Sequence, residues 1–197
     1  MEIVFASANP GKLKEAQEIL GPSFRILSPA DLGFTGEIPE THETIPENSA
    51  EKALFIWHKF HKPCFADDTG LEIDALGGAP GVYSARYAGE SKDSSLNVAK
   101  VLAEMKSVPE GKRGAQFRCV VSYVDGDGNL TSFEGICRGS IGLAPVAGRG
   151  FGYDPIFIPE GGSRTMSEMT SEEKNAISHR GKAMDALVCH LLKNQGR

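Results

Sequence analysis

The chain has 197 residues, of which 40% are hydrophobic and 24% are charged, enough for one large domain or two closely packed lobes. Its net charge of −5 and its lack of a dense Lys/Arg run disfavour a protein that grips a nucleic-acid backbone, although a few local cations suffice for a small anionic ligand. No segment approaches transmembrane length, and the apolar run at residues 3–6 is too short for a signal peptide. We therefore expect a cytoplasmic protein with buried, reduced thiols at its four scattered cysteines: Cys64, Cys119, Cys137 and Cys189.

Apolar periodicity predicts interleaved strands and helices in the first part of the chain. Strands are expected at residues 2–7, at 24–27 and from 64, and helices at about 9–20, 47–61 and 93–106. Two long strands, 115–124 and 130–138, are expected to pair through the loop 125–129, and a third strand to follow at 155–158. A final helix is expected from about 170 to 193, in a mixed α/β fold with a helix-flanked sheet.

The first segment that could carry chemistry is Ser-Ala-Asn-Pro-Gly-Lys at residues 7–12. It lies where a buried strand meets a helix, and Asn9 is placed to cap that helix with Pro10 in its first turn. Backbone N–H groups at a helix start, together with the charge of Lys12, suit a polyphosphate. The segment lacks P-loop spacing, and an ordinary capped strand–helix turn explains the same pattern.

An acidic turn, Ala-Asp-Asp-Thr-Gly at residues 66–70, is the second candidate. Two adjacent carboxylates after an apolar strand are costly unless a cation or hydrogen bonds compensate them, and in an extended strand they point to opposite faces. Asp68 could hold Mg²⁺ or act as a base toward water, with Gly70 permitting a sharp turn. A second oxygen ligand could come from the acidic loop that contains Glu40. Solvated acids in a plain turn are the alternative.

Two later segments add candidate ligand contacts. Residues 148–155 place Phe151 between glycines and ahead of Asp154, which suits close approach by a ligand and stacking on a base, or simply a glycine-rich connection. In the final helix, Arg180 falls in the middle of the apolar stripe formed by Ile177, Met184 and Leu187. A guanidinium in that position requires an acceptor, either an internal carboxylate or a ligand oxygen.

In this order the segments resemble the inosine triphosphate pyrophosphatase family, also called XTP/dITP diphosphatases. The resemblance covers nearly the whole chain and rests on residues 7–12, 47–48, 66–71, 76–87, 151–155 and 173–181. It implies a single domain over residues 1–197 with an elongated, curved central sheet, helices on its faces, and two lobes with a cleft between them. It also implies a homodimer and Mg²⁺-dependent hydrolysis of ITP, dITP and XTP to the monophosphate and pyrophosphate.

The same resemblance implies a set of residue roles. Asp68 would be the catalytic base and, with Glu40, a metal ligand, while Asp67 would be a supporting or second-metal group. The substrate would contact Ser7, Ala8, Asn9, Pro10, Gly11, Lys12, Thr69, Phe151, Gly152, Tyr153, Asp154, Lys174, His179 and Arg180. Donors on His179 or Arg180 would pair with the C6 carbonyl of a deaminated purine and oppose the amino group of ATP.

Two alternatives remain open from the sequence. One is a Maf-like pyrophosphatase that acts on other modified nucleotides, and the other is a catalytically silent nucleotide-binding regulator. Intact Asp68 and Lys12 disfavour the silent regulator, and nucleic-acid binding is a more distant possibility because the chain is acidic.

Overall fold

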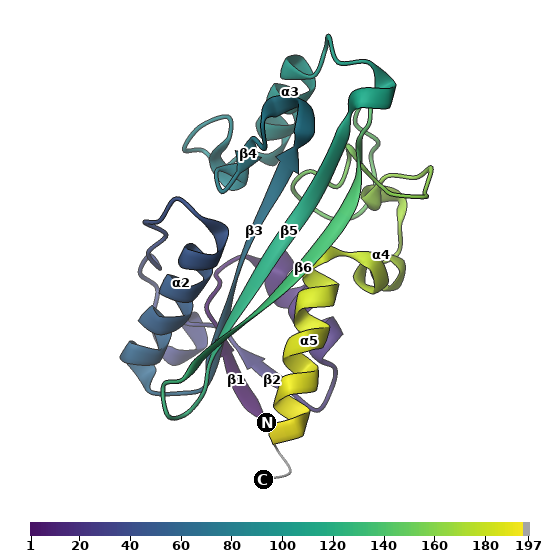
Figure 1. Ribbon diagram of the computed structural model, residues 1–197. Helices are drawn as coiled ribbons and strands as arrows, with labels where there is room; N and C mark the ends of the chain where they lie inside the picture. The colour runs from purple at the N-terminus through teal and green to yellow at the C-terminus, as the bar shows by residue number, and fades with distance from the viewer. Residues whose placement is uncertain (195–197) are drawn as a thin grey trace. The chain divides into compact units, whose positions relative to one another are not determined.

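The computed structural model describes residues 1–194 and contains one mixed seven-stranded sheet with helices packed against it (Figure 1). The strand order is β2-β1-β3-β5-β6-β7, with β4 paired to β3. The strands are β1 Glu2–Phe5, β2 Arg25–Leu27, β3 Cys64–Ile73, β4 Pro80–Gly81, β5 Gly114–Val124, β6 Leu130–Ile141 and β7 Phe157–Pro159. The α-helices are α1 Pro10–Leu20, α2 Ile45–Phe60, α3 Ser94–Glu104, α4 Ser171–Ile177 and α5 His179–Asn194. Short 3₁₀ helices are η1 Ala30–Leu32, η2 Asp74–Leu76, η3 Ser84–Arg86, η4 Glu110–Lys112 and η5 Met166–Glu168.

The chain divides into two compact units. Unit 1 comprises Met1–Asp68, Cys119–Gly135 and the segment from Arg180 onward, and unit 2 comprises Thr69–Arg118 and Ile136–His179. Strands β3, β5 and β6 each contribute residues to both units. The sequence prediction of a single domain over residues 1–197 stays a prediction.

Strand β1 explains how unit 1 is layered. Its residues are buried on both faces: Ile3 and Phe5 lie in a core cluster with α1 and α5, whereas Val4 and Ala6 lie in a second cluster with α2. This alternation follows from the two-residue period of a strand, and the continuous apolar run is typical of a parallel strand covered on both sides. Accordingly, β1 pairs in parallel with both β2 and β3.

Unit 2 has its own apolar core. It contains Leu71 and Ile73 from the second half of β3, together with Val101 and Met105 from the α3 region and Phe157 from β7. Of the apolar residues on α3 and just after it, Met105 is buried and Leu102 packs against this core, whereas Leu96 is 53% exposed. Asn97, Val98 and Val101 complete the buried face.

Two predicted boundaries are wrong. Strand β3 continues to Ile73, so Asp67 and Asp68 lie inside a strand and not in a turn at its end. The final helix is interrupted at Ser178, whose backbone is extended, so α4 and α5 are separate helices and Ile177 is not part of the buried stripe. The helix start at Asn9 is confirmed, and Thr170 and Glu173 form a capping box where α4 begins. Three cysteines are buried as expected, whereas Cys189 is exposed.

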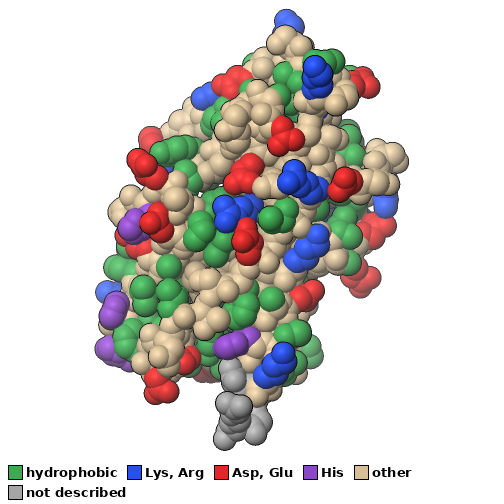
Figure 2. Space-filling model, viewed as in Figure 1, with side chains coloured by type: hydrophobic (Ala, Val, Ile, Leu, Met, Phe, Trp, Pro, Cys, Tyr) green, Lys and Arg blue, Asp and Glu red, His purple; other side chains and the backbone are tan. Residues whose placement is uncertain are grey.

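The mixed α/β fold predicted from the sequence is confirmed. No helix in the described part of the chain is long and apolar enough to cross a membrane. On the face drawn in Figure 2, Lys and Arg side chains are interspersed with Asp and Glu, so charges of one sign do not gather into a stripe there.

Candidate active site

The segment at residues 7–12 forms a closed helix cap. The side chain of Asn9 accepts hydrogen bonds from the backbone N–H groups of Gly11 and Lys12 at 2.9 and 3.2 Å, and Ser7 Oγ accepts one from Asn9 N at 3.2 Å. Two of the N–H groups expected to face a phosphate are therefore satisfied internally. The cap gives α1 a rigid start. It thereby fixes the backbone positions of Lys12 in the first turn of the helix and of Glu15 in the second.

Asp67 lies at the centre of a buried ionic cluster in unit 1. Its side chain is 0% exposed and accepts from Lys12 Nζ at 2.8 Å and from Arg180 Nε at 3.1 Å. Arg180 in turn donates to Glu15 through Nη1. Burial alone raises the pKa of a carboxyl group, but Lys12 and Arg180 outweigh it and hold the pKa of Asp67 well below its usual range. Asp67 is therefore a permanent anion between two cations.

Asp68 lies in a second cluster on the opposite face of β3. Lys52 Nζ, from α2, donates to Asp68 Oδ1 at 3.0 Å and to Glu40 Oε1 at 2.6 Å. Burial disfavours the charge on Lys52, but the two carboxylates outweigh it and raise the pKa of the ammonium group. For Asp68 the balance is reversed, because burial exceeds the attraction of Lys52 and Lys12 and raises the pKa of the carboxyl group. A carboxyl group with a raised pKa is a better proton acceptor than a free one near neutral pH.

The two faces of β3 explain why adjacent acids have different partners. Phe65 belongs to the cluster under α1 and α5, and Ala66 belongs to the cluster under α2. Continuing this alternation places Asp67 beside α1 and α5, and Asp68 beside α2. Ser49 of α2 fixes the local geometry, since its buried hydroxyl lies 3.3 Å from the carbonyl of Ala66 and 2.9 Å from that of Val120.

Sequence reasoning missed Lys52 and Glu15. Lys52 is 4% exposed and lies on the same face of α2 as Asn48, Ser49 and Ile56, which are also buried. Hydrophobic periodicity gives no signal for Lys52, because it assigns a lysine to the exposed face of a helix; the structure shows that this face is buried, where a lysine requires an acceptor. A buried guanidinium such as that of Arg180 requires a carboxylate partner inside the protein. The sequence predicts such an acceptor without identifying it, and the structure shows that the acceptors are Asp67 and Glu15.

The residues around Asp68 fit a magnesium ion held with the help of a ligand. Within residues 1–194 no group of three or more His, Cys, Asp or Glu side chains is arranged to hold a metal on its own. Mg²⁺, however, commonly uses one or two carboxylates together with waters and substrate phosphates. Asp68 Oδ2 is buried and accepts no hydrogen bond from the described residues, which leaves a lone-pair site for a cation or a water.

Unit 2 contains a third charged cluster. Lys174 Nζ donates to Asp154 Oδ2 at 2.7 Å and lies 4.8 Å from the centre of the Phe151 ring. Asp154 Oδ2 also accepts from Phe151 N at 3.0 Å. Gly150 permits this arrangement, because its φ is +87° and a Cβ there would lie 2.1 Å from that same oxygen. Of the predicted base-contact residues, the structure thus brings Phe151, Asp154 and Lys174 together.

The neighbouring aromatic residues are more deeply buried. Tyr153 is 5% exposed, and its hydroxyl donates to the carbonyl of Ser84 at 2.7 Å. His179 is 4% exposed and stacks on Phe117 with ring centres 4.6 Å apart. His179 is therefore not a surface residue, and its proposed contact with substrate stays a prediction.

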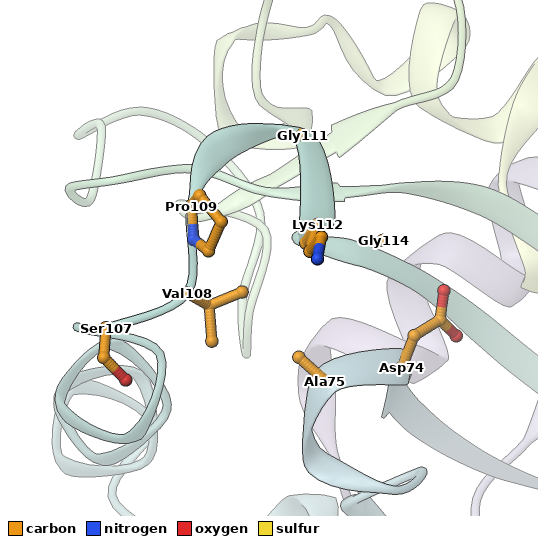
Figure 3. Close-up of a pocket in the computed structure, with 8 residues that line it drawn as sticks. All are labelled: Asp74, Ala75, Ser107, Val108, Pro109, Gly111, Lys112 and Gly114. Atoms are coloured by element: carbon orange, nitrogen blue, oxygen red, sulfur yellow. The ribbon is translucent and has the colours of Figure 1, made fainter.

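A pocket of about 570 Å³ lies elsewhere in unit 2 (Figure 3). Figure 3 labels the residues that line it: Asp74, Ala75, Ser107, Val108, Pro109, Gly111, Lys112 and Gly114. None of the residues singled out from the sequence lines it.

Comparison with known proteins identifies the family of the chain. The model of the Ham1 family matches residues 3–190. The chain belongs to the Ham1 family. It is 48% identical to the dITP/XTP pyrophosphatase of Bacillus subtilis over 187 residues, covering 94% of each chain. It is 46% identical to the enzyme of the same name from Flavobacterium psychrophilum, covering 95% of this chain and 97% of the relative.

Solved structures of Ham1 proteins share the fold. The Ham1 protein of Staphylococcus aureus has a TM-score of 0.88 and 36% identity, with 98% of this chain and 100% of that chain covered. A structure named nucleoside-triphosphatase or dITP/XTP pyrophosphatase from Mycobacterium abscessus has a TM-score of 0.76 and 42% identity, covering 95% of this chain and 98% of that chain. At these identities the likeness extends to sequence as well as fold, and the resemblance drawn from the motifs is confirmed.

Proposed function

We propose that this Ham1-family protein is a nucleoside-triphosphate pyrophosphatase. It hydrolyses deaminated purine nucleotides (ITP, dITP and XTP) to the monophosphate and pyrophosphate and so removes them from the nucleotide pool. The observation that carries the proposal is the pair of adjacent acids on β3, each buried against its own set of cations, in a chain 48% identical to a named dITP/XTP pyrophosphatase.

The charges of unit 1 favour the requirement for a divalent cation. The two clusters place the carboxylates of Glu15, Glu40, Asp67 and Asp68 beside the cations Lys12, Lys52 and Arg180. A triphosphate entering this site would therefore meet carboxylates as well as cations. Bound Mg²⁺ would offset the repulsion from the carboxylates, neutralise phosphate charge and orient the attacking water. Asp68 and Glu40 are the side chains that we propose to hold it.

Four charged residues of the two clusters in unit 1 then have defined roles. Lys12 offers its ammonium group to the phosphates while Asp67 keeps its position fixed, and Arg180 keeps Asp67 charged and immobile. Asp68 accepts a proton from the water that attacks the polyphosphate. Hydrolysis of this kind depends on positioning and electrostatics and requires no covalent bond to the protein.

The cluster in unit 2 suits recognition of a purine. Phe151 presents an aromatic ring that can stack on a base, and Asp154 and Lys174 provide an acceptor and a donor beside it. We propose that these residues contact the base, together with His179. The physical basis of selectivity is the C6 carbonyl, which accepts a hydrogen bond where ATP carries an amino group that donates one.

One experiment tests the proposal most directly. Purified protein with Mg²⁺ is given a panel of nucleoside triphosphates, and both products are identified. We expect monophosphate and pyrophosphate, with ITP, dITP and XTP turned over faster than ATP, dTTP or UTP. Faster turnover of dTTP or UTP favours the Maf-like alternative, and binding of nucleotides without turnover favours the silent regulator.

Three further expectations accompany the function. Activity should disappear on chelation of divalent cations and return with added Mg²⁺. The protein should behave as a homodimer in size-exclusion chromatography with light scattering, and it should fractionate with the cytoplasm of its host cell. The metal requirement and the homodimer are proposals that follow from the family resemblance, and the cytoplasmic location is one that follows from the sequence.

A further inference from the structure

Lys52 has an arrangement that differs from an ordinary structural ion pair. Its side chain is 5% exposed, yet its single ammonium group contacts two carboxylates, Glu40 at 2.6 Å and Asp68 at 3.0 Å. By contrast, Lys174, the other buried lysine, contacts Asp154 at 2.7 Å and lies against an aromatic ring. The ammonium group of Lys52 therefore lies between two carboxylates, in the position that a metal ion bound by both of them would occupy.

Those two acids are the proposed metal ligands, and the inference rests in this respect on the proposed function. We propose that Lys52 acts as an internal counter-ion in place of the metal when nucleotide is absent, and that it makes binding of a divalent cation conditional on nucleotide. A cation approaching the free protein meets an ammonium group already bound to both ligands. Displacing it without another acceptor would leave a buried charge uncompensated.

Nucleotide supplies the missing acceptor. Lysine carries three donors on a flexible four-carbon stem, and phosphate oxygens can accept from them. Once Lys52 turns to phosphate, Glu40 and Asp68 become available to a divalent cation that also binds the phosphates. A cation from solvent can reach the pair of carboxylates through Glu40, because the side chain of Glu40 is 36% exposed whereas that of Lys52 is 5% exposed.

One oxygen of Asp68 already favours this exchange. Oδ1 is occupied by Lys52, whereas Oδ2 is buried and accepts no hydrogen bond from the described residues. A buried acceptor without a donor costs free energy, and a bound cation removes that cost. Oδ2 of Asp68 is thus available to a metal ion, whereas Oδ1 becomes available only when Lys52 moves away.

The consequence is thermodynamic coupling between metal and nucleotide. If nucleotide tightens metal binding by some factor, metal must tighten nucleotide binding by the same factor. In a cell this arrangement would leave the free protein without metal and keep the catalytic ligands protected until substrate arrives.

The test is Lys52→Met, a neutral replacement of similar length, with Mn²⁺ as the probe. Binding of Mn²⁺ to the full chain is measured by electron paramagnetic resonance and calorimetry without nucleotide. Removing the lysine frees two buried carboxylates, so we expect Mn²⁺ affinity to rise by about tenfold or more over the unchanged protein, by the Coulomb attraction of one additional unpaired charge at close range. Unchanged or weaker binding would overturn the proposal.

A matched control separates this effect from the general loss of a buried lysine. Lys174→Met removes a buried lysine that pairs with Asp154, an acid outside the proposed pair of metal ligands, and should leave Mn²⁺ affinity within about twofold of the unchanged protein. An equal gain in this variant would contradict the assignment of the effect to Lys52.

Two further measurements keep the test decisive. Adding Glu40→Gln to Lys52→Met should abolish the gain, and a gain that persists would show that the metal lies elsewhere. If Lys52→Met is unstable, Mn²⁺ should raise its thermal midpoint more than that of the unchanged protein, and an equal rise would reject the idea.

The coupling itself is measured with the α,β-methylene analogue of inosine triphosphate, which cannot be cleaved at the proposed bond. The analogue should tighten Mn²⁺ binding strongly in the unchanged protein and by a factor about ten smaller in Lys52→Met; equal factors would refute the coupling. None of these readings depends on turnover, so they can fail while pyrophosphate release from ITP is normal, and the proposed function can fail while they succeed.

Discussion

Asp67→Asn is the perturbation for which the structure gives the clearest magnitude. The carboxylate is 0% exposed and contacts Lys12 at 2.8 Å and Arg180 at 3.1 Å, whose own side chain is 3% exposed. An asparagine has nearly the same shape but leaves both cations facing a neutral group. Removing one partner of a buried ion pair costs about 3–5 kcal/mol. For a chain of this size each kcal/mol lowers the melting temperature by about 2–4 °C, so the expected loss is on the order of 10 °C.

The matched control is the exposed pair of Glu2 and Arg25, which has the same separation of 2.8 Å but side chains that are 53% and 74% exposed. Glu2→Gln should lower the melting temperature by a few degrees at most, because solvent screens an exposed pair. Differential scanning calorimetry at pH 7 compares the two. If Asp67→Asn shifts the transition no more than Glu2→Gln, the buried cluster does not stabilise the fold as argued.

The pH dependence supplies a second check. The pKa of Asp67 is lowered in the folded protein, so its contribution to stability is present above the ordinary carboxyl pKa of about 4 and is lost as the pH falls through the folded value. The difference in melting temperature between the unchanged protein and Asp67→Asn should therefore be constant between about pH 5 and 7. It should narrow progressively below about pH 4. A difference that grew on acidification would contradict the assigned direction of the pKa shift.

Two other substitutions probe the site and its frame. Asp68→Asn should reduce pyrophosphate release by about 100-fold or more, because the proton acceptor is lost. It should lower the melting temperature less than Asp67→Asn does, because burial raises the pKa of Asp68 and Lys52 keeps Glu40 as an acceptor; an equal or larger loss would show that the charge of Asp68 is as structural as that of Asp67. Gly148→Ala would place a Cβ 2.1 Å from the carbonyl oxygen of Ser167 and should lower the free energy of unfolding in urea by about 1–3 kcal/mol. Gly126→Ala has no atom within 4 Å and is the control, expected to change little.

The sequence predicted the opposite directions of Asp67 and Asp68 because that follows from strand geometry alone. It failed to predict that β3 continues past them, because Thr-Gly after two acids is typical of a turn. The extension depends on Leu71 and Ile73, which are buried in the core of unit 2. Their alternation was visible in the sequence, but whether it forms strand or turn is decided by packing against residues distant in the chain.

The partners of the buried cations lay beyond sequence reasoning for a related reason. Arg180 was recognised as needing an acceptor, yet Asp67 lies 113 residues away and Glu15 lies 165 residues away. Hydrophobic periodicity assigns polar residues to the exposed face of a helix. It therefore predicts an exposed Lys52, whereas the structure buries this side chain. The break at Ser178 has no proline or glycine to mark it, and α4, the helix before it, buries Lys174 and leaves Ile177 exposed.

The division of labour between the two acids depends on the register of a single strand pair. β1 pairs with β3 through Val4 with Cys64 and Phe5 with Phe65, and the Phe5 and Phe65 rings stack with centres 4.5 Å apart. A shift of β3 by one residue would move every side chain to the other face. Asp67 would then face α2, and Asp68 would face the cations of α1 and α5. Because the two environments move the pKa values of these carboxyls in opposite directions, the packing that sets this register also determines which acid fits the proposed role of base and which is the fixed anion.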